Sequence, residues 1–170
     1  NEIGSMGYGA AWGDYDNDQD FDLYLANWGV NRLYENIDNT FSNVAEESNL
    51  ESEELSNGVS WGDYNNDGML DLWTSNIREP DDVYINMGDG NWDGTSDPYF
   101  LSGTQDVVSG DINNDGWLDV FAAGLEMQNG PQGAKYTSLL YKNVTLDESF
   151  STNHWLKIRL EGSQYTPYEH

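Results

Sequence analysis

The chain has no cysteine and only 6 lysine and arginine residues among its 170 residues. Without cysteine, neither disulfide bonds nor thiolate metal sites can form. The basic residues are outnumbered by 31 aspartate and glutamate residues, which gives a formal net charge of -25. Such a charge makes nucleic acids and anionic membranes poor partners and cations good ones. Long apolar runs are also absent, because none approaches the ~20 residues of a transmembrane helix, and we expect no membrane insertion.

Apolar and aromatic residues are nevertheless plentiful. Hydrophobic residues make up 37% of the chain and aromatic residues 14%, which is enough for the core of one domain. A packed domain with this much negative charge repels itself, and the usual remedies are a salty environment or bound metal ions that neutralise the clustered carboxylates. The first residues, Asn1 to Gly4, contain neither an initiator methionine nor a signal-peptide pattern, which predicts a processed chain or a fragment.

An acidic motif recurs three times at nearly constant spacing. Trp12 to Asp18 reads WGDYDND, Trp61 to Asp67 reads WGDYNND, and residues 110–115 read GDINND. The offsets between the copies are 49 residues (63 − 14) and 48 residues (111 − 63). Regular spacing over three copies indicates a fold built from repeats.

Each repeat is predicted to be β-structure, with strands on both sides of the acidic motif. The segments before it are Tyr8 to Trp12, Gly58 to Trp61 and Asp106 to Ser109, and those after it are Phe21 to Ala26, Leu70 to Ser75 and Leu118 to Ala123. A further strand is expected at Arg32 to Tyr34, Val83 to Ile85 and Leu139 to Tyr141. The runs after the motif are apolar on both faces, so both faces must be covered. The middle of a β-sandwich would cover them, but four short strands in ~48 residues favour the stacked blades of a β-propeller.

The acidic motifs follow the pattern D-x-[DN]-x-D-x-x-x-D, with oxygen-bearing side chains at positions 1, 3, 5 and 9. They are Asp14, Asp16, Asp18 and Asp22 in the first copy, Asp63, Asn65, Asp67 and Asp71 in the second, and Asp111, Asn113, Asp115 and Asp119 in the third. Alternate side chains of a tight loop converge, and like charges ~4 Å apart repel by several kcal/mol unless a cation binds. Oxygen ligands without histidine or cysteine indicate Ca²⁺, with Mg²⁺ as the weaker alternative. We expect three or more Ca²⁺ ions, with one in each loop.

Positions 6 and 7 of the loops carry further information. Gly68 and Gly116 at position 6 permit the positive φ of a sharp turn, whereas Gln19 departs from this rule in the first loop. Position 7 is Asp20, Met69 or Trp117. Such varied chemistry suits a position where only the backbone carbonyl binds the metal. The structural alternative for all three loops is a set of simple Asp-, Asn- and Gly-rich turns.

A fourth acidic segment has the same spacing but lies outside the 48-residue phase. Its oxygen-bearing residues are Asp89, Asn91, Asp93 and Asp97. This segment is either a further metal site or a plain hairpin turn.

The first copy carries GAAWGDYDND at residues 9–18 followed by DLYLAN at residues 22–27, and it resembles an FG-GAP/VCBS repeat, the unit of integrin-alpha-like β-propellers. Residues 153–162 resemble the start of the ASPIC/UnbV segment that often follows such repeats. The resemblance implies calcium in the loop between the first two strands of each blade, in an extracellular or cell-surface protein. We expect three repeats in residues 1–150, at about 5–52, 53–103 and 104–150, and a C-terminal strand in 151–170.

A non-enzymatic adhesion or assembly module is the expected function, with a protein or a glycan at the cell surface as partner. Catalysis has little support, because His154 and His170 belong to no Ser/His/Asp or Cys/His arrangement. The alternative is a glycan-binding or glycan-cleaving propeller, since 7 tryptophans and 11 tyrosines offer rings for stacking on sugars. Of the tryptophans, Trp12, Trp61 and Trp73 are predicted to lie in the core, and Trp28, Trp92 and Trp117 are predicted to be the more exposed.

Three blades are fewer than the 4–8 blades of typical closed propellers. The chain is therefore expected either to self-associate, as a ring or a filament, or to belong to a longer chain that has additional blades. A strand from His154 to Glu161, with Leu156, Ile158 and Leu160 on one face, is predicted to complete a blade in its own chain or in a neighbouring copy.

Overall fold

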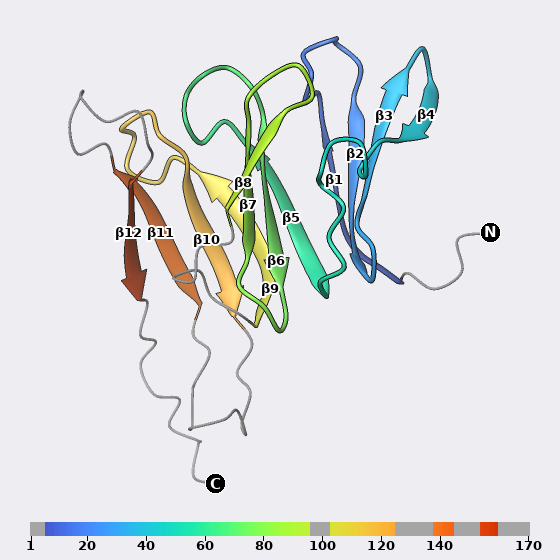
Figure 1. Ribbon diagram of the computed structural model, residues 1–170. Helices are drawn as coiled ribbons and strands as arrows, with labels where there is room; N and C mark the ends of the chain where they lie inside the picture. Colours follow the sequence, from blue (N-terminus) through green and yellow to red (C-terminus); the bar gives the residue numbers. More distant parts are fainter. Residues whose placement is uncertain (1–5, 96–102, 125–137, 145–153, 160–170) are drawn as a thin grey trace, which may run out of the picture.

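The structure is a computed structural model that describes residues 6–95, 103–124, 138–144 and 154–159. These residues contain twelve β-strands and no helix. The strands form three four-stranded antiparallel sheets, which stand side by side in the manner of blades (Figure 1). The predicted all-β fold is confirmed, and the arrangement is that of an incomplete β-propeller.

The three blades repeat one order of strands. The first blade contains β1 (Met6–Gly13), β2 (Asp22–Trp28), β3 (Arg32–Ile37) and β4 (Thr40–Asn43). The second contains β5 (Ser56–Gly62), β6 (Asp71–Asn76), β7 (Asp82–Asn86) and β8 (Trp92–Thr95). The third contains β9 (Thr104–Gly110), β10 (Asp119–Gly124), β11 (Leu139–Val144) and β12 (His154–Arg159). Since β12 pairs with β11 of the same chain, the predicted C-terminal strand completes the third blade.

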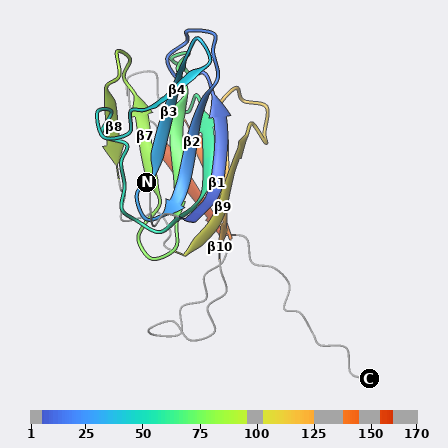
Figure 2. The same ribbon diagram turned by 90° about the vertical axis from the view of Figure 1, so that its right-hand side faces the viewer.

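The blades stack through their first strands. β5 of the central blade contacts β1 on one side and β9 on the other. Figure 2 views this stack from the side of the first blade, with the other two blades behind it.

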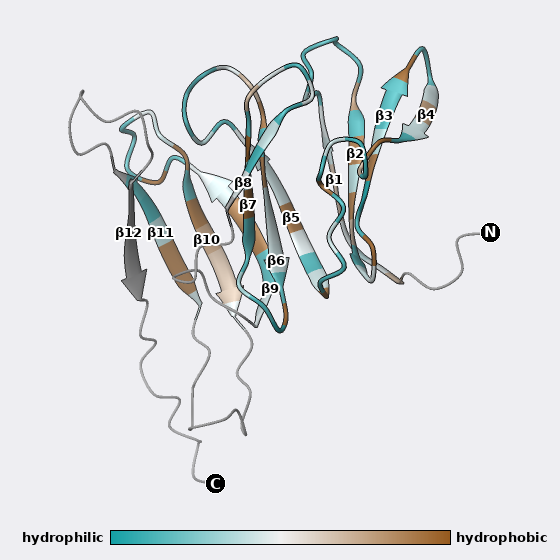
Figure 3. Cartoon of the chain, in the orientation of Figure 1, coloured by the Kyte–Doolittle hydropathy of each residue, from teal (hydrophilic) through white to brown (hydrophobic). Residues whose placement is uncertain are grey.

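Two apolar clusters fill the spaces between the blades. Tyr24 and Leu33 of the first blade pack with Leu72 of the second, and Trp73 of the second packs with Val120 of the third. All six residues of β6 are buried, so this strand is covered on both faces as its sequence predicts. In Figure 3, hydrophobic residues lie mostly on strands such as β10 and β11, whereas the loops are mainly hydrophilic.

The prediction for the tryptophans is correct for Trp73 and wrong for Trp12. Trp73 is fully buried and Trp61 packs against the cluster between the first and second blades, but Trp12 is 59% exposed. Trp12 lies on the outer face of the first blade, where Phe41 contacts its edge but no other blade of the described residues packs on it. The tryptophans predicted to be exposed are only partly so, since Trp28 stacks on Tyr8 and Trp92 packs near Trp61.

Candidate metal sites

Each acidic motif forms the loop between the first and second strands of its blade. The three loops therefore lie at the same edge of the stacked sheets (Figure 1). The position is set by the strands on either side, because β1, β5 and β9 all end immediately before the first aspartate of the motif. The repeat in the sequence thus becomes a row of acidic loops.

The first loop brings three carboxylates together. Ligand atoms of Asp14, Asp16 and Asp18 lie within 4.8 Å of one another. Backbone groups shape the loop: the Gln19 N–H donates to Asp14 Oδ2 at 3.1 Å, and the Asp20 N–H donates to Asp18 Oδ1 at 2.8 Å. Asp14 Oδ1 is shielded from solvent and has no hydrogen-bond partner among the described residues. Burial, followed by the charges of the neighbouring aspartates, raises the pKa of Asp16.

The donor set of the first loop fits a hard cation. A shielded carboxylate oxygen without a partner costs free energy, and three converging carboxylates repel one another. A cation bound by Asp14, Asp16 and Asp18 removes both costs at once. Oxygen donors of this kind are those that Ca²⁺ prefers.

The second loop repeats this framework with one chemical difference. The Gly68 N–H donates to Asp63 Oδ2 at 2.9 Å and the Met69 N–H donates to Asp67 Oδ1 at 2.9 Å. Here the amide of Asn65 donates to Asp67 Oδ2 at 2.7 Å, so a side-chain donor relieves part of the negative charge. The first loop has Asp16 at this position and no such donor.

The third loop matches the second in each of these contacts. The Gly116 N–H donates to Asp111 Oδ2 at 2.9 Å, and the Asn113 amide donates to Asp115 Oδ2 at 2.7 Å. The Trp117 N–H donates to Asp115 Oδ1 at 3.0 Å. Backbone hydrogen bonds, of which the one from Gly116 has the largest effect, lower the pKa of Asp111.

The aspartates at position 9 stay predicted ligands, and the structure shows that they also accept hydrogen bonds from the backbone. Asp22, Asp71 and Asp119 are buried, and each accepts two backbone N–H groups. In the second loop, Asp71 accepts from Tyr64 at 2.7 Å and from Asn86 at 2.9 Å. These carboxylates tie the loop to the third strand of the blade, and Asp22 is not part of the cluster of three in the first loop. Burial raises the pKa of Asp22 to about 6 and that of Asp71 to about 7.

Position 6 has the positive φ expected for it in all three loops. Gly68 and Gly116 have φ values of 89° and 87°. Gln19 is held at a φ of 80°, a left-handed conformation that costs a residue with a side chain about 1 kcal/mol or more. The carbonyl groups at position 7 stay predicted ligands.

The fourth segment forms a hairpin turn between β7 and β8. The Met87 N–H donates to the Asn91 carbonyl at 2.9 Å, and the Asn91 N–H donates to the Gly88 carbonyl at 3.0 Å. Asp93 lies within β8, opposite Ile85 of β7. Asp97 lies outside the described residues. Among Asp89, Asn91 and Asp93, the structure does not repeat the framework of the other three loops.

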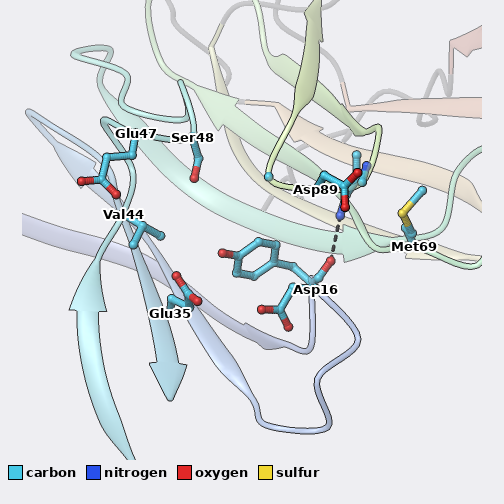
Figure 4. A pocket seen from close by; sticks show the side chains of 11 residues that line it. Asp16, Glu35, Val44, Glu47, Ser48, Met69 and Asp89 are labelled. Atoms are coloured by element: carbon cyan, nitrogen blue, oxygen red, sulfur yellow. Dashed lines mark hydrogen bonds between the residues drawn. The ribbon is translucent and has the colours of Figure 1, made fainter.

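An acidic cavity lies beside the first loop. Its volume is about 690 Å³, and its lining includes Asp16, Glu35, Glu47 and Asp89 but no basic residue. Figure 4 shows these side chains around the opening. Burial, followed by the charges of Asp16, Asp18 and Glu47, raises the pKa of Glu35. The cavity extends the negative potential of the first loop.

Sequence reasoning missed a set of asparagines that join neighbouring blades. Asn86 donates its amide to the Tyr15 carbonyl at 2.8 Å, and Asn143 donates to the Tyr64 carbonyl at 2.8 Å. The signal for them is a recurring Tyr-x-Asn triplet at residues 34–36, 84–86 and 141–143. Asn143 also begins an N-glycosylation triplet, but its side chain is buried and occupied by this contact.

Three stacked blades, each with an acidic loop between its first and second strands, define a β-propeller-type repeat protein. The family model described as FG-GAP-like repeat matches residues 14–74 and 63–122. These matches together span more than half of the chain, and the chain belongs to the FG-GAP-like repeat family. No curated protein matches it significantly.

The family matches end at residue 122. The ASPIC/UnbV resemblance of residues 153–162 is unconfirmed and stays a prediction. Within the described part of the chain, no helix has the length and apolar character needed to cross a membrane.

Proposed function

We propose that this chain is an extracellular, calcium-binding structural module of a surface assembly, and that its role is not enzymatic. The observation that carries the proposal is the convergence of Asp14, Asp16 and Asp18 within 4.8 Å around a shielded oxygen that has no partner. The second and third loops have the same backbone framework. Extracellular calcium is abundant enough to fill sites of moderate affinity.

Calcium in this proposal holds the blades together. The three loops lie in one row and are linked in series, because Asn17 donates to the Gly68 carbonyl at 3.4 Å and Asn66 donates to the Gly116 carbonyl at 3.0 Å. A cation that fixes one loop also fixes the asparagine that contacts the next blade. Binding to the folded state alone stabilises it by mass action.

Thermal unfolding with and without calcium tests the proposal. We expect the chelated chain to gain melting temperature on addition of Ca²⁺, with a smaller gain from Mg²⁺, and we expect elemental analysis to find three or more calcium ions per chain. A melting temperature that chelation leaves unchanged, together with less than one calcium per chain, would refute calcium binding.

A role in protein contact is favoured over glycan binding by the positions of the aromatic residues. Trp28 and Trp92 pack against other rings, whereas Trp12, Phe21 and Phe41 are exposed on the first blade. Trp12 and Phe41 form an edge contact, with ring centroids 6.0 Å apart. An exposed apolar cluster of this kind marks an interaction surface.

A further inference from the structure

The two interfaces between blades are built from the same set of contacts. In each, an asparagine of the following blade donates its amide to a backbone carbonyl of the preceding blade. Asn86 of the second blade reaches the Tyr15 carbonyl, and Asn143 of the third reaches the Tyr64 carbonyl, both at 2.8 Å. Residues at equivalent positions of the repeat therefore make equivalent contacts between blades, so the contact groups on each face of a blade follow from its sequence.

The acidic loops contribute a second contact in the opposite direction. The fourth residue of a loop donates to the sixth residue of the loop that follows, from Asn17 to the Gly68 carbonyl and from Asn66 to the Gly116 carbonyl. In the third loop, the equivalent donor is Asn114, and the first loop offers the equivalent acceptor at Gln19. The described residues provide no partner for this donor or for this acceptor.

The third contact that both interfaces share is the packing of an apolar side chain of one blade against a glycine of the preceding blade. A Cβ atom on Gly13 would lie 2.9 Å from the ring of Trp61 and 3.1 Å from Leu70 Cδ1 of the second blade. A Cβ atom on Gly62 would lie 3.0 Å from Leu118 Cδ1 of the third blade. The first and second blades thus each present a glycine on which an apolar side chain of the following blade packs.

The outer face of the first blade carries the repeat equivalents of the residues that pack on such a glycine. We call it the leading face, and it comprises Trp12, Phe21, Leu23, Tyr34 and Asn36. Trp12 stands at the repeat position of Trp61, and Phe21 stands at that of Leu70; they are 59% and 66% exposed. Asn36 stands at the position of Asn86, but its amide donates only to the Phe21 carbonyl of its own blade among the described residues.

The outer face of the third blade carries the complementary groups. We call it the trailing face, and it comprises Val108, Gly110, Ile112, Phe121 and Leu140. A Cβ atom on Gly110 would have no described atom within 4 Å, unlike one on Gly13 or Gly62. Val108, Phe121 and Leu140 are register partners that form an apolar row across the sheet. Ile112, at the position of Tyr15 and Tyr64, is 58% exposed.

We infer that the leading face of one copy docks on the trailing face of a second copy and reproduces the contacts between blades. Trp12 and Phe21 then cover Gly110, Asn36 donates to the Ile112 carbonyl, and Asn114 donates to the Gln19 carbonyl. Two copies supply six blades, a number within the 4–8 blades of closed propellers. If the rotation does not close, the same contact produces an open chain of copies.

This inference rests on the assembly role proposed above but not on calcium binding. Two substitutions test it, each on one face. Trp12→Glu places a charge in the leading face, and Gly110→Glu places a charge in the trailing face, where the described structure leaves room for the side chain. Met87→Glu is the matched control, because Met87 is 61% exposed on the central blade and belongs to neither face.

Light scattering after size-exclusion chromatography in calcium-containing buffer gives the readout. We expect the unmodified chain and Met87→Glu to associate as concentration rises, and each face variant alone to stay monomeric. A 1:1 mixture of the two face variants should regain a two-chain species and nothing larger, because each contributes one intact face. If either variant fails to fold, Phe21→Glu or Val108→Glu replaces it.

An unmodified chain that stays monomeric at all concentrations would overturn the inference, and the two faces would then serve further blades or other proteins. Face variants that still associate alone, or a mixture that stays monomeric, would overturn it too. The calcium-dependent melting temperature is measured on the same samples. A chain stabilised by calcium but monomeric refutes only the docking, and a chain that associates without calcium stabilisation refutes only the calcium site.

Discussion

Replacing Asn86 with alanine should weaken the contact between the first two blades. The Asn86 amide donates to the Tyr15 carbonyl at 2.8 Å and to the Leu70 carbonyl at 3.2 Å, and its Oδ1 accepts the Gly88 N–H at 3.0 Å. The side chain is only 3% exposed. Asn86→Ala therefore removes three hydrogen bonds made by a side chain that is almost fully buried.

The size of the effect follows from the groups left without a partner. A buried polar group that loses its hydrogen bond costs about 1–3 kcal/mol. The Tyr15 carbonyl is the most affected, since it lies between blades, and the Gly88 N–H lies nearer the surface. We expect Asn86→Ala to lower the free energy of unfolding by about 2–4 kcal/mol.

Asn36→Ala is the matched control, because Asn36 occupies the same repeat position in the first blade. Its amide makes one hydrogen bond, to the Phe21 carbonyl at 3.2 Å, and none to another blade among the described residues. We expect Asn36→Ala to cost about half as much.

Urea unfolding at saturating calcium, followed by tryptophan fluorescence, compares the two variants with the loops in the same state. Measurements at low protein concentration keep self-association from contributing. Equal losses for Asn86→Ala and Asn36→Ala, or a loss below about 0.5 kcal/mol for Asn86→Ala, would refute the role given to the contact between blades.

Three further predictions concern the loops and the buried carboxylates. Gln19→Gly should raise the free energy of unfolding by about 1 kcal/mol, since it relieves a left-handed residue; a lower urea midpoint would contradict this. In calcium, Asp67→Ala should lower the melting temperature more than Asp93→Ala, because Asp67 belongs to a repeat loop and Asp93 to a hairpin; equal losses would contradict the ranking. Burial raises the pKa of Asp81 to about 7, so its ionisation opposes folding. In the metal-free chain, the free energy of unfolding should therefore rise as the pH falls from 8 to 5. A free energy of unfolding that instead falls over this pH range, measured by urea titration, would contradict the prediction.

The repeat architecture was predictable because its signal is redundant. Runs such as Leu70 to Ser75 are apolar on both faces, and this pattern predicts a strand covered on both sides, as β6 is. β4 gave no such signal, because all four of its residues are exposed. β8 was not predicted from the sequence, because the aspartates in and beside it suggested a metal-binding loop.

The acidic loops were predictable in position but not in every role. Spacing alone places Asp14 and Asp22 in one motif, but it does not reveal that Asp22 also accepts the N–H groups of Tyr15 and Asn36. Trp12 shows a similar limit. Its local sequence is the same as that of Trp61, but its burial depends on whether another blade lies against it.

Because each blade packs mainly on its immediate neighbours, cooperativity in this molecule runs along a single line. The central blade is supported from both sides and each outer blade from one side only. Opening of the structure should accordingly begin by fraying at the ends of the row and reach β6 last. Every blade added to the row converts an end into an interior position, so stability here is a property of the length of the stack as much as of any blade within it.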